Sequence, residues 1–136
     1  MINKQRLTRS LTILALSCLS TVSFAKDLVI DNQTNENSTC KTYGKGKCST
    51  ELLKENGVTP AHQSRTYTEP KLRIACYPTP ENCTAEVYAD DNCSGAIIAT
   101  AVFDLRTGIK SITTIPNGPY VIDAPIGGFK VTLRYR

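Results

Sequence analysis

The residues CYPTPENCTAEVYADDNCSGAIIATAVFD, numbers 76–104, decide how this chain folds, because they combine strand-like patterns with strong turn signals. In residues 83–89 the side chains alternate with a period of two, which is typical of a half-buried strand. Residues 96–103 form a second apolar run of strand length. Between them, residues 91–95 have the composition of a turn. The stretch therefore predicts a β-hairpin with its tip at residues 91–95.

A further strand is predicted just upstream, where Leu72, Ile74 and Cys76 alternate with other side chains. The two prolines in residues 77–82 exclude that segment from a strand interior, because proline removes a ladder donor. Cys76 and Cys83 then lie on either side of a six-residue turn. A disulfide closes this turn if the two Cα atoms come within about 7 Å.

Residues 1–25 have the features of a secretory signal peptide. A basic N-terminal region is followed by a short apolar run and a small-x-small cleavage site at residues 23–25. The apolar run is well short of the roughly 20 residues that a membrane-spanning helix needs. We therefore expect residues 26–136 to form a single β domain that is secreted or periplasmic, with no transmembrane segment after cleavage.

The net charge gives no reason to expect a nucleic-acid partner. Three of the 16 Lys and Arg residues lie in the signal segment, so the rest of the chain carries about one net positive charge. The sequence also lacks a basic stripe interleaved with aromatic residues. We expect a protein or glycan partner and no nucleic acid.

Five of the six cysteines follow the signal segment, and an oxidising compartment makes disulfides the default for them. The spacing favours a Cys40–Cys48 pair and a Cys76–Cys83 pair. Cys93 is left without an assigned partner and is an alternative partner of either Cys76 or Cys83. An odd number of cysteines leaves one thiol unpaired in any case.

The rest of the chain adds strands, loops and one helix. Strands are predicted in residues 26–32, 109–115, 120–124 and 129–135, a short helix in residues 49–57, and loops in residues 33–47 and 58–70. About seven strands separated by turns predict an all-β fold. We expect a small antiparallel β-sandwich or Greek-key barrel with one short helix, stabilised by disulfides.

Three segments resemble a Greek-key motif of the βγ-crystallin superfamily: VYADDNCSG (87–95), IKSI (109–112) and NGPYVI (117–122). The resemblance covers about residues 87–123 and implies a small secreted β protein. Members of that superfamily include protease inhibitors and toxins, and many bind calcium. Arg106 and Thr107 stand where the family places calcium-ligating Asp or Asn, so the family's own calcium site is not expected here.

The sequence carries no recognised catalytic motif and one histidine, His62, so we expect neither an enzyme nor a cofactor. Asp90, Asp91 and Asn92 are the candidate metal ligands, because hard oxygen ligands of the kind that calcium prefers cluster there.

The hypothesis is a non-enzymatic binding protein that presents disulfide-constrained loops, with an inhibitor of a hydrolase as one concrete form. The candidate contact residues lie in two loops: Tyr77, Pro78, Thr79, Pro80, Glu81 and Asn82 in one, Lys45 and Lys47 in the other. One alternative is a small secreted hydrolase or toxin whose site is assembled from distant residues such as His62, Asp90 and Asp91. Another is a structural envelope component, or a module that dimerises through the unpaired thiol.

Overall fold

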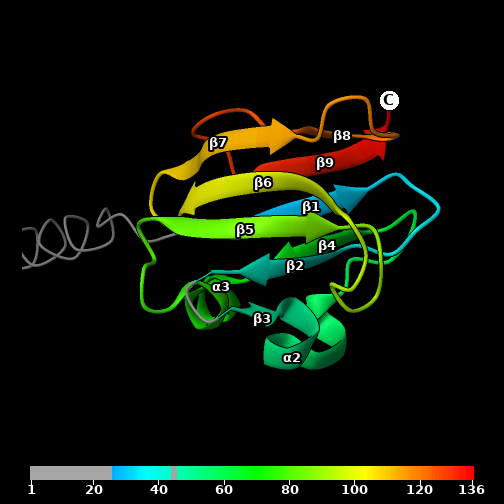
Figure 1. Cartoon of the computed structure of the whole chain (residues 1–136). Coiled ribbons are helices and arrows are strands. Elements are labelled where there is room, and N and C mark those ends of the chain that lie inside the picture. The colour runs from blue at the N-terminus through cyan, green and yellow to red at the C-terminus, as the bar shows by residue number, and fades with distance from the viewer. Residues whose placement is uncertain (1–25, 44–45) are drawn as a thin grey trace, which may run out of the picture.

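The structure, a computed structural model, describes residues 26–43 and 46–136 and consists of two stacked β-sheets with helices at one edge (Figure 1). The signal-peptide prediction for residues 1–25 lies outside the described residues. One sheet has the strand order β4 (Ser64–Tyr67), β1 (Leu28–Asn32), β9 (Lys130–Tyr135), β8 (Tyr120–Asp123). The other has the order β3 (Lys47–Cys48), β2 (Thr39–Thr42), β5 (Cys83–Tyr88), β6 (Ile97–Asp104), β7 (Gly108–Thr114). The helices are α2 (Ser49–Leu53), the 3-10 helix η1 (Lys54–Gly57) and α3 (Glu69–Cys76). The prediction of a disulfide-stabilised β-sandwich is confirmed, with nine described strands instead of about seven.

The predicted central hairpin is present as β5 and β6. The two strands pair antiparallel, with Ala85 opposite Ala101 and Cys83 opposite Phe103. Cys83, Ala85 and Val87 all face the space between the sheets, as the period of two predicts. β7 continues the antiparallel arrangement on the far side of β6.

One strand pair departs from the antiparallel prediction. β1 and β9 run parallel, with Ile30 opposite Val131. Parallel neighbours need a long connection, and here nearly the whole described chain connects the first strand to the last. Alternation of side chains marks each strand and its buried face but does not reveal the direction of its partner.

The hydrophobic core lies between the sheets. Leu133 of β9 is 1% exposed and belongs to one buried cluster with Ile122 on the same sheet and Phe103 and Ile109 on the other. Phe103 and Phe129 meet edge to face, with ring centroids 5.7 Å apart, which joins the two layers near one end.

The strand predicted around Leu72, Ile74 and Cys76 is absent, and these residues belong to helix α3 instead. Pro70 lies in the first turn, where a proline is compatible with a helix, and Arg73 forms an ion pair with Glu69 one turn away. The buried side chains are Leu72, Ala75 and Cys76, which have helical spacing, whereas Ile74 is exposed. The period of two inferred from Leu72, Ile74 and Cys76 was therefore wrong, and the helical period applies. The Cys76–Cys83 disulfide joins the end of a helix to a strand and does not close a hairpin.

Two strands lie in segments predicted as loops. β2 and β4 are each four residues long and mostly polar, and β4 forms the edge of its sheet. Short polar strands carry little periodic signal, because their stability comes from backbone pairing with neighbours.

The predicted helix at residues 49–57 is confirmed as two pieces, α2 and η1. Ser49 is its first residue and not its N-cap, and the Ser49 hydroxyl donates a hydrogen bond to the Gly57 carbonyl over 2.6 Å. A Cβ at position 57 would lie 2.1 Å from the Ser49 carbonyl oxygen, so this contact requires glycine.

Candidate functional site

Residues 77–82, which we call the stapled loop, are held at both ends by the Cys76–Cys83 disulfide. This predicted pair is confirmed, with a Cα–Cα distance of 5.2 Å. Inside the loop, the Thr79 amide donates to the Cys76 carbonyl over 2.8 Å and the Asn82 amide donates to the Thr79 carbonyl over 3.1 Å. The Leu105 amide donates to the Pro80 carbonyl over 3.0 Å, which ties the loop to the β6–β7 connection. The loop backbone is therefore fixed by a covalent bond and three hydrogen bonds.

The side chains of the stapled loop point outward. Tyr77 is 63% exposed. Pro78, Thr79, Glu81 and Asn82 are exposed and Pro80 is half-buried. The candidate contact residues of this loop are thus accessible on a rigid backbone.

Two further exposed hydrophobic side chains lie on segments attached to the stapled loop, and no sequence pattern marked them as candidate contact residues. Tyr43 is 57% exposed and Ile74 is 47% exposed. The Thr42 hydroxyl donates to the Ala75 carbonyl over 2.5 Å, and the Tyr43 amide donates to the Thr84 carbonyl over 2.9 Å. These bonds attach the segment carrying Tyr43 directly to the segments on either side of the stapled loop. Only the folded chain brings the three segments together.

The predicted Cys40–Cys48 bridge is wrong. β2 and β3 pair so that Lys41 lies opposite Cys48. Opposed residues of an antiparallel pair share a face, and successive residues of a strand alternate faces, so Cys40 points away from Cys48. Cys48 is instead bonded to Cys93, with Cα atoms 5.8 Å apart. The alternative pairing of Cys93 with Cys76 or Cys83 is therefore also wrong.

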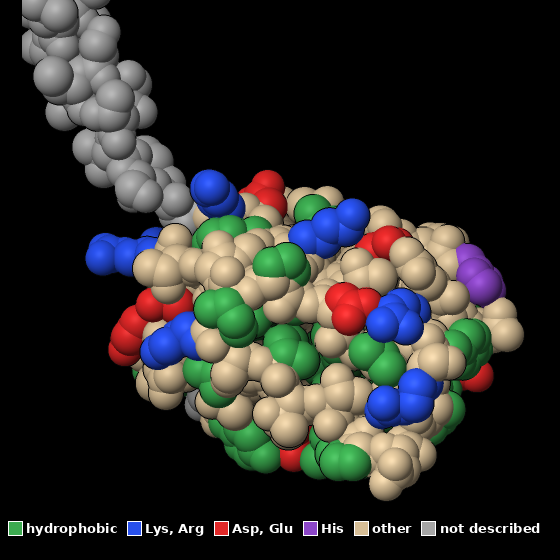
Figure 2. All heavy atoms as spheres, turned by 90° about the horizontal axis from the view of Figure 1, so that it is seen from above, with side chains coloured by type: hydrophobic (Ala, Val, Ile, Leu, Met, Phe, Trp, Pro, Cys, Tyr) green, Lys and Arg blue, Asp and Glu red, His purple; other side chains and the backbone are tan. Residues whose placement is uncertain are grey.

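Because Cys48 is bonded to Cys93, no disulfide closes the basic loop between β2 and β3. Lys47 is exposed at the start of β3, and Lys45 lies outside the described residues. Among the described residues, the loop ends are joined by the pairing of Thr42 with Lys47 and by a hydrogen bond from the Gly46 amide to the Thr42 carbonyl over 2.8 Å. On the face drawn in Figure 2, Lys and Arg side chains are interspersed with Asp and Glu and do not form one stripe.

In the part of the chain that the structure describes, the unpaired thiol is that of Cys40, and it faces the interior of the protein. Its side chain borders the space between the sheets, and its removal from water raises the pKa of the thiol from 9.0 to about 12. A thiol with this pKa stays protonated at neutral pH and is a poor nucleophile. Its position also argues against dimerisation through this thiol.

Asp90, the first of the candidate calcium ligands, holds the β5–β6 turn together. One carboxylate oxygen accepts hydrogen bonds from the Thr39 hydroxyl and from the amides of residues 92 and 93, and the other accepts from the amides of residues 94 and 95. Burial raises the pKa of Asp90, but these donors outweigh it and leave the pKa below its ordinary value. Asp91 accepts a hydrogen bond from the Asn37 side-chain amide over 2.6 Å. The carboxylates are thus engaged with protein donors.

The residues offered for a distant-residue catalytic site, His62, Asp90 and Asp91, each form hydrogen bonds with other side chains. His62 is exposed, and its Nε2 atom lies 2.6 Å from the Asn35 side-chain oxygen, whereas Asp90 and Asp91 contact the groups just described. Within residues 26–43 and 46–136, no group of three or more His, Cys, Asp or Glu side chains is arranged to hold a metal ion. In that same part of the chain, no helix is long and apolar enough to cross a membrane.

Comparison with known proteins relates this chain to one described group. Residues 4–133 match the family model described as "NttC: T2SS substrate NttC". Among solved structures, the chain is similar to the Legionella pneumophila type II secretion system substrate NttC, with a TM-score of 0.62 and 22% sequence identity. The similarity covers 83% of this chain and 100% of the other. A comparison with curated proteins found no match.

Proposed function

Because this chain belongs to the family of the type II secretion substrate NttC, and is thus a secreted protein, we propose that it is a non-enzymatic binding protein that acts through its stapled loop. The observation that carries this proposal is the Cys76–Cys83 disulfide, which fixes a loop that exposes Tyr77. The partner is a protein or a glycan outside the reducing cytosol, where both disulfides persist.

The rigidity of the loop favours binding. A flexible loop loses conformational entropy when it docks, and a loop that is already fixed avoids most of that loss. Tyrosine adds a large apolar ring with few rotatable bonds, and it is enriched among the residues that dominate binding energy. The exposed side chains of Tyr43 and Ile74 on adjoining segments extend the apolar area available to a partner.

Inhibition of a secreted hydrolase is one concrete form of this function. A protruding, disulfide-fixed loop suits insertion into an enzyme cleft, because it enters without reorganising. This form predicts that a hydrolase loses activity in stoichiometric complex with the protein.

The test is binding of the oxidised domain, residues 26–136, to panels of secreted hydrolases and immobilised glycans. Tyr77→Ala should weaken binding by about 30-fold or more if Tyr77 is a dominant contact. Ile126→Ala removes another exposed side chain, 69% accessible and outside the loop, and should leave binding unchanged. The proposal fails if no panel member binds, or if the Tyr77→Ala variant binds as tightly as the wild-type domain.

A further inference from the structure

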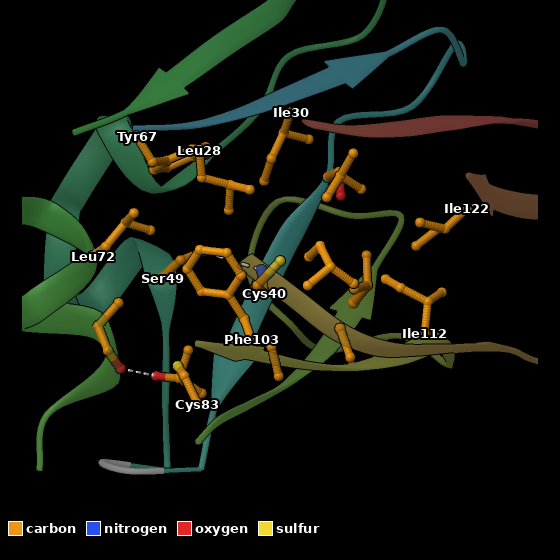
Figure 3. Close-up of a pocket in the computed structure, with 18 of the residues that line it drawn as sticks. Leu28, Ile30, Cys40, Ser49, Tyr67, Leu72, Cys83, Phe103, Ile112 and Ile122 are labelled. Atoms are coloured by element: carbon orange, nitrogen blue, oxygen red, sulfur yellow. Dashed lines mark hydrogen bonds between the residues drawn. The ribbon is translucent and has the colours of Figure 1, made fainter. Parts of the chain in front are cut away.

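An apolar cavity of about 120 Å³ lies between the two sheets, next to the unpaired thiol. In Figure 3, Leu28 and Ile30 from β1 point across this space toward Phe103 and Cys40 of the other sheet. Cys40, Ala85 and Ala101 border the cavity and are only partly buried, although their side chains face the interior. This is expected for side chains with empty space on one side.

The cavity exists because small residues occupy neighbouring positions on the inner face of the five-stranded sheet. Ala85 and Ala101 are directly paired across β5 and β6, and Ala101 pairs with Ile112 of β7. Cys40 lies on β2, the other neighbour of β5. Larger side chains at Ala85 and Ala101 would extend into the space below the four-stranded sheet. The cavity is thus built into the sequence of the strands that define the fold.

The lining offers water almost nothing to bind. Four hydroxyl groups border the cavity, and each is already hydrogen-bonded to another protein oxygen: Ser38 to Tyr88, Thr42 to Ala75, Ser49 to Gly57, and Tyr67 to Thr59. No buried side-chain nitrogen or oxygen among the described residues lacks a partner. A buried water needs two to four polar partners, and the Cys40 thiol is a weak one.

We propose that this cavity is a binding site for a small, uncharged, apolar molecule, of the size of benzene or a short alkyl group. A dry cavity of about 150 Å³ lined by Leu, Ile and Phe binds benzene and xenon, and this cavity is similar in volume and lining. The cavity is separate from the stapled loop, so the domain would have a second binding site, which is apolar and internal. The absence of free hydrogen-bonding groups excludes ligands with a buried charge or amide.

The experiment uses oxidised residues 26–136 with methyl-labelled Ile, Leu and Val, titrated with benzene and, separately, exposed to xenon. Saturable methyl shifts are expected at Ile30, Ile112 and Leu133, which line the cavity, and none at the exposed Ile115 and Ile126. Benzene should also slow alkylation of Cys40, because a ligand that binds only the closed protein reduces opening by the factor 1 + [L]/Kd. At ten times Kd, the rate should fall about tenfold.

Ala85→Leu fills the cavity and should abolish both the methyl shifts and the protection of Cys40. Ala96→Leu adds the same side chain at an exposed position outside the lining, and should behave as wild type. Ala101→Val is a smaller filling change that serves if Ala85→Leu does not fold. The proposal is overturned if benzene and xenon leave the cavity methyls of the wild-type domain unshifted. Shifts that persist unchanged in a folded filling variant would overturn it equally.

Discussion

Removing the two disulfides one at a time should destabilise the domain unequally. Cys48 and Cys93 are 45 residues apart in sequence, and Cys76 and Cys83 are 7 apart. In the chain-entropy model, a cross-link stabilises by restricting the unfolded chain, and the effect grows with the logarithm of the loop length. The longer loop gives about 4 kcal/mol and the shorter about 2.5 kcal/mol at 25 °C. The difference of about 1.5 kcal/mol is the quantity to measure.

The measurement compares the double variants C48A/C93A and C76A/C83A in urea unfolding, followed by far-UV circular dichroism. Alanine is used in both variants. Cys48, Cys76 and Cys83 are nearly fully buried and Cys93 is half-buried, so C48A/C93A does not lose more packing than C76A/C83A. The free energy of unfolding should fall further in C48A/C93A. An equal loss, or a larger loss in C76A/C83A, would refute the chain-entropy reasoning for this domain. A changed urea m-value would show that the denatured state itself differs.

Three further outcomes follow from the structure. Gly57→Ala forces a Cβ into the Ser49 carbonyl and should cost about 2–4 kcal/mol in urea unfolding, whereas Gly46→Ala, which has no atom within 4 Å of the added Cβ but a positive φ, should cost about 1 kcal/mol. Asp90→Asn should cost about 1–3 kcal/mol at pH 7. The folded pKa of Asp90 is lowered, so the stabilisation that its carboxylate provides is present above the unfolded pKa of about 3.9 and is lost as the pH falls through the folded pKa. The difference in free energy of unfolding between the wild type and Asp90→Asn should therefore shrink between pH 5 and pH 3. A difference that stays constant over this range would contradict the prediction. Cys40 should react with a disulfide reagent at pH 8 at least about 100-fold more slowly in the folded domain than in urea, since its pKa rises to about 12, and rapid stoichiometric labelling of the folded domain would show that the thiol is accessible.

The sequence was informative wherever a strand is buried on one face. The alternation in residues 83–89 and 129–135 marked β5 and β9 together with their inward side chains, because one face of each strand meets the core. The same rule failed for α3, where Leu72, Ile74 and Cys76 fit a period of two but only Leu72 and Cys76 are buried. A short apolar set can fit both periods, and the helix-compatible Pro70 was the signal that distinguished them.

Cysteine pairing was predictable from the sequence only where two cysteines close in sequence are also close in the fold. Cys76 and Cys83 bracket a tight loop, and sequence distance was enough to pair them. Cys40 and Cys48 are nearly as close in sequence, yet a one-residue difference in register places them on opposite faces of adjacent strands. The Cys48–Cys93 bond joins segments 45 residues apart that the β3-β2-β5 strand order brings together, and no local pattern carries that information.

The cavity lowers the free energy of unfolding of the domain, and the disulfides raise it. An unfilled cavity of about 120 Å³ costs about 3 kcal/mol, at about 24 cal/mol per Å³. That is a large fraction of the 5–15 kcal/mol by which folded domains are usually stable. The Cys48–Cys93 bond alone offsets a cost of this size, and Cys83 of the other bond borders the cavity directly. Oxidation after export therefore allows this small domain to keep small side chains at Cys40, Ala85 and Ala101. Because separate contributions to the free energy of unfolding add, Ala85→Leu should stabilise the reduced and the oxidised domain by similar amounts and so restore part of the stability that reduction removes, which urea unfolding with and without reductant measures.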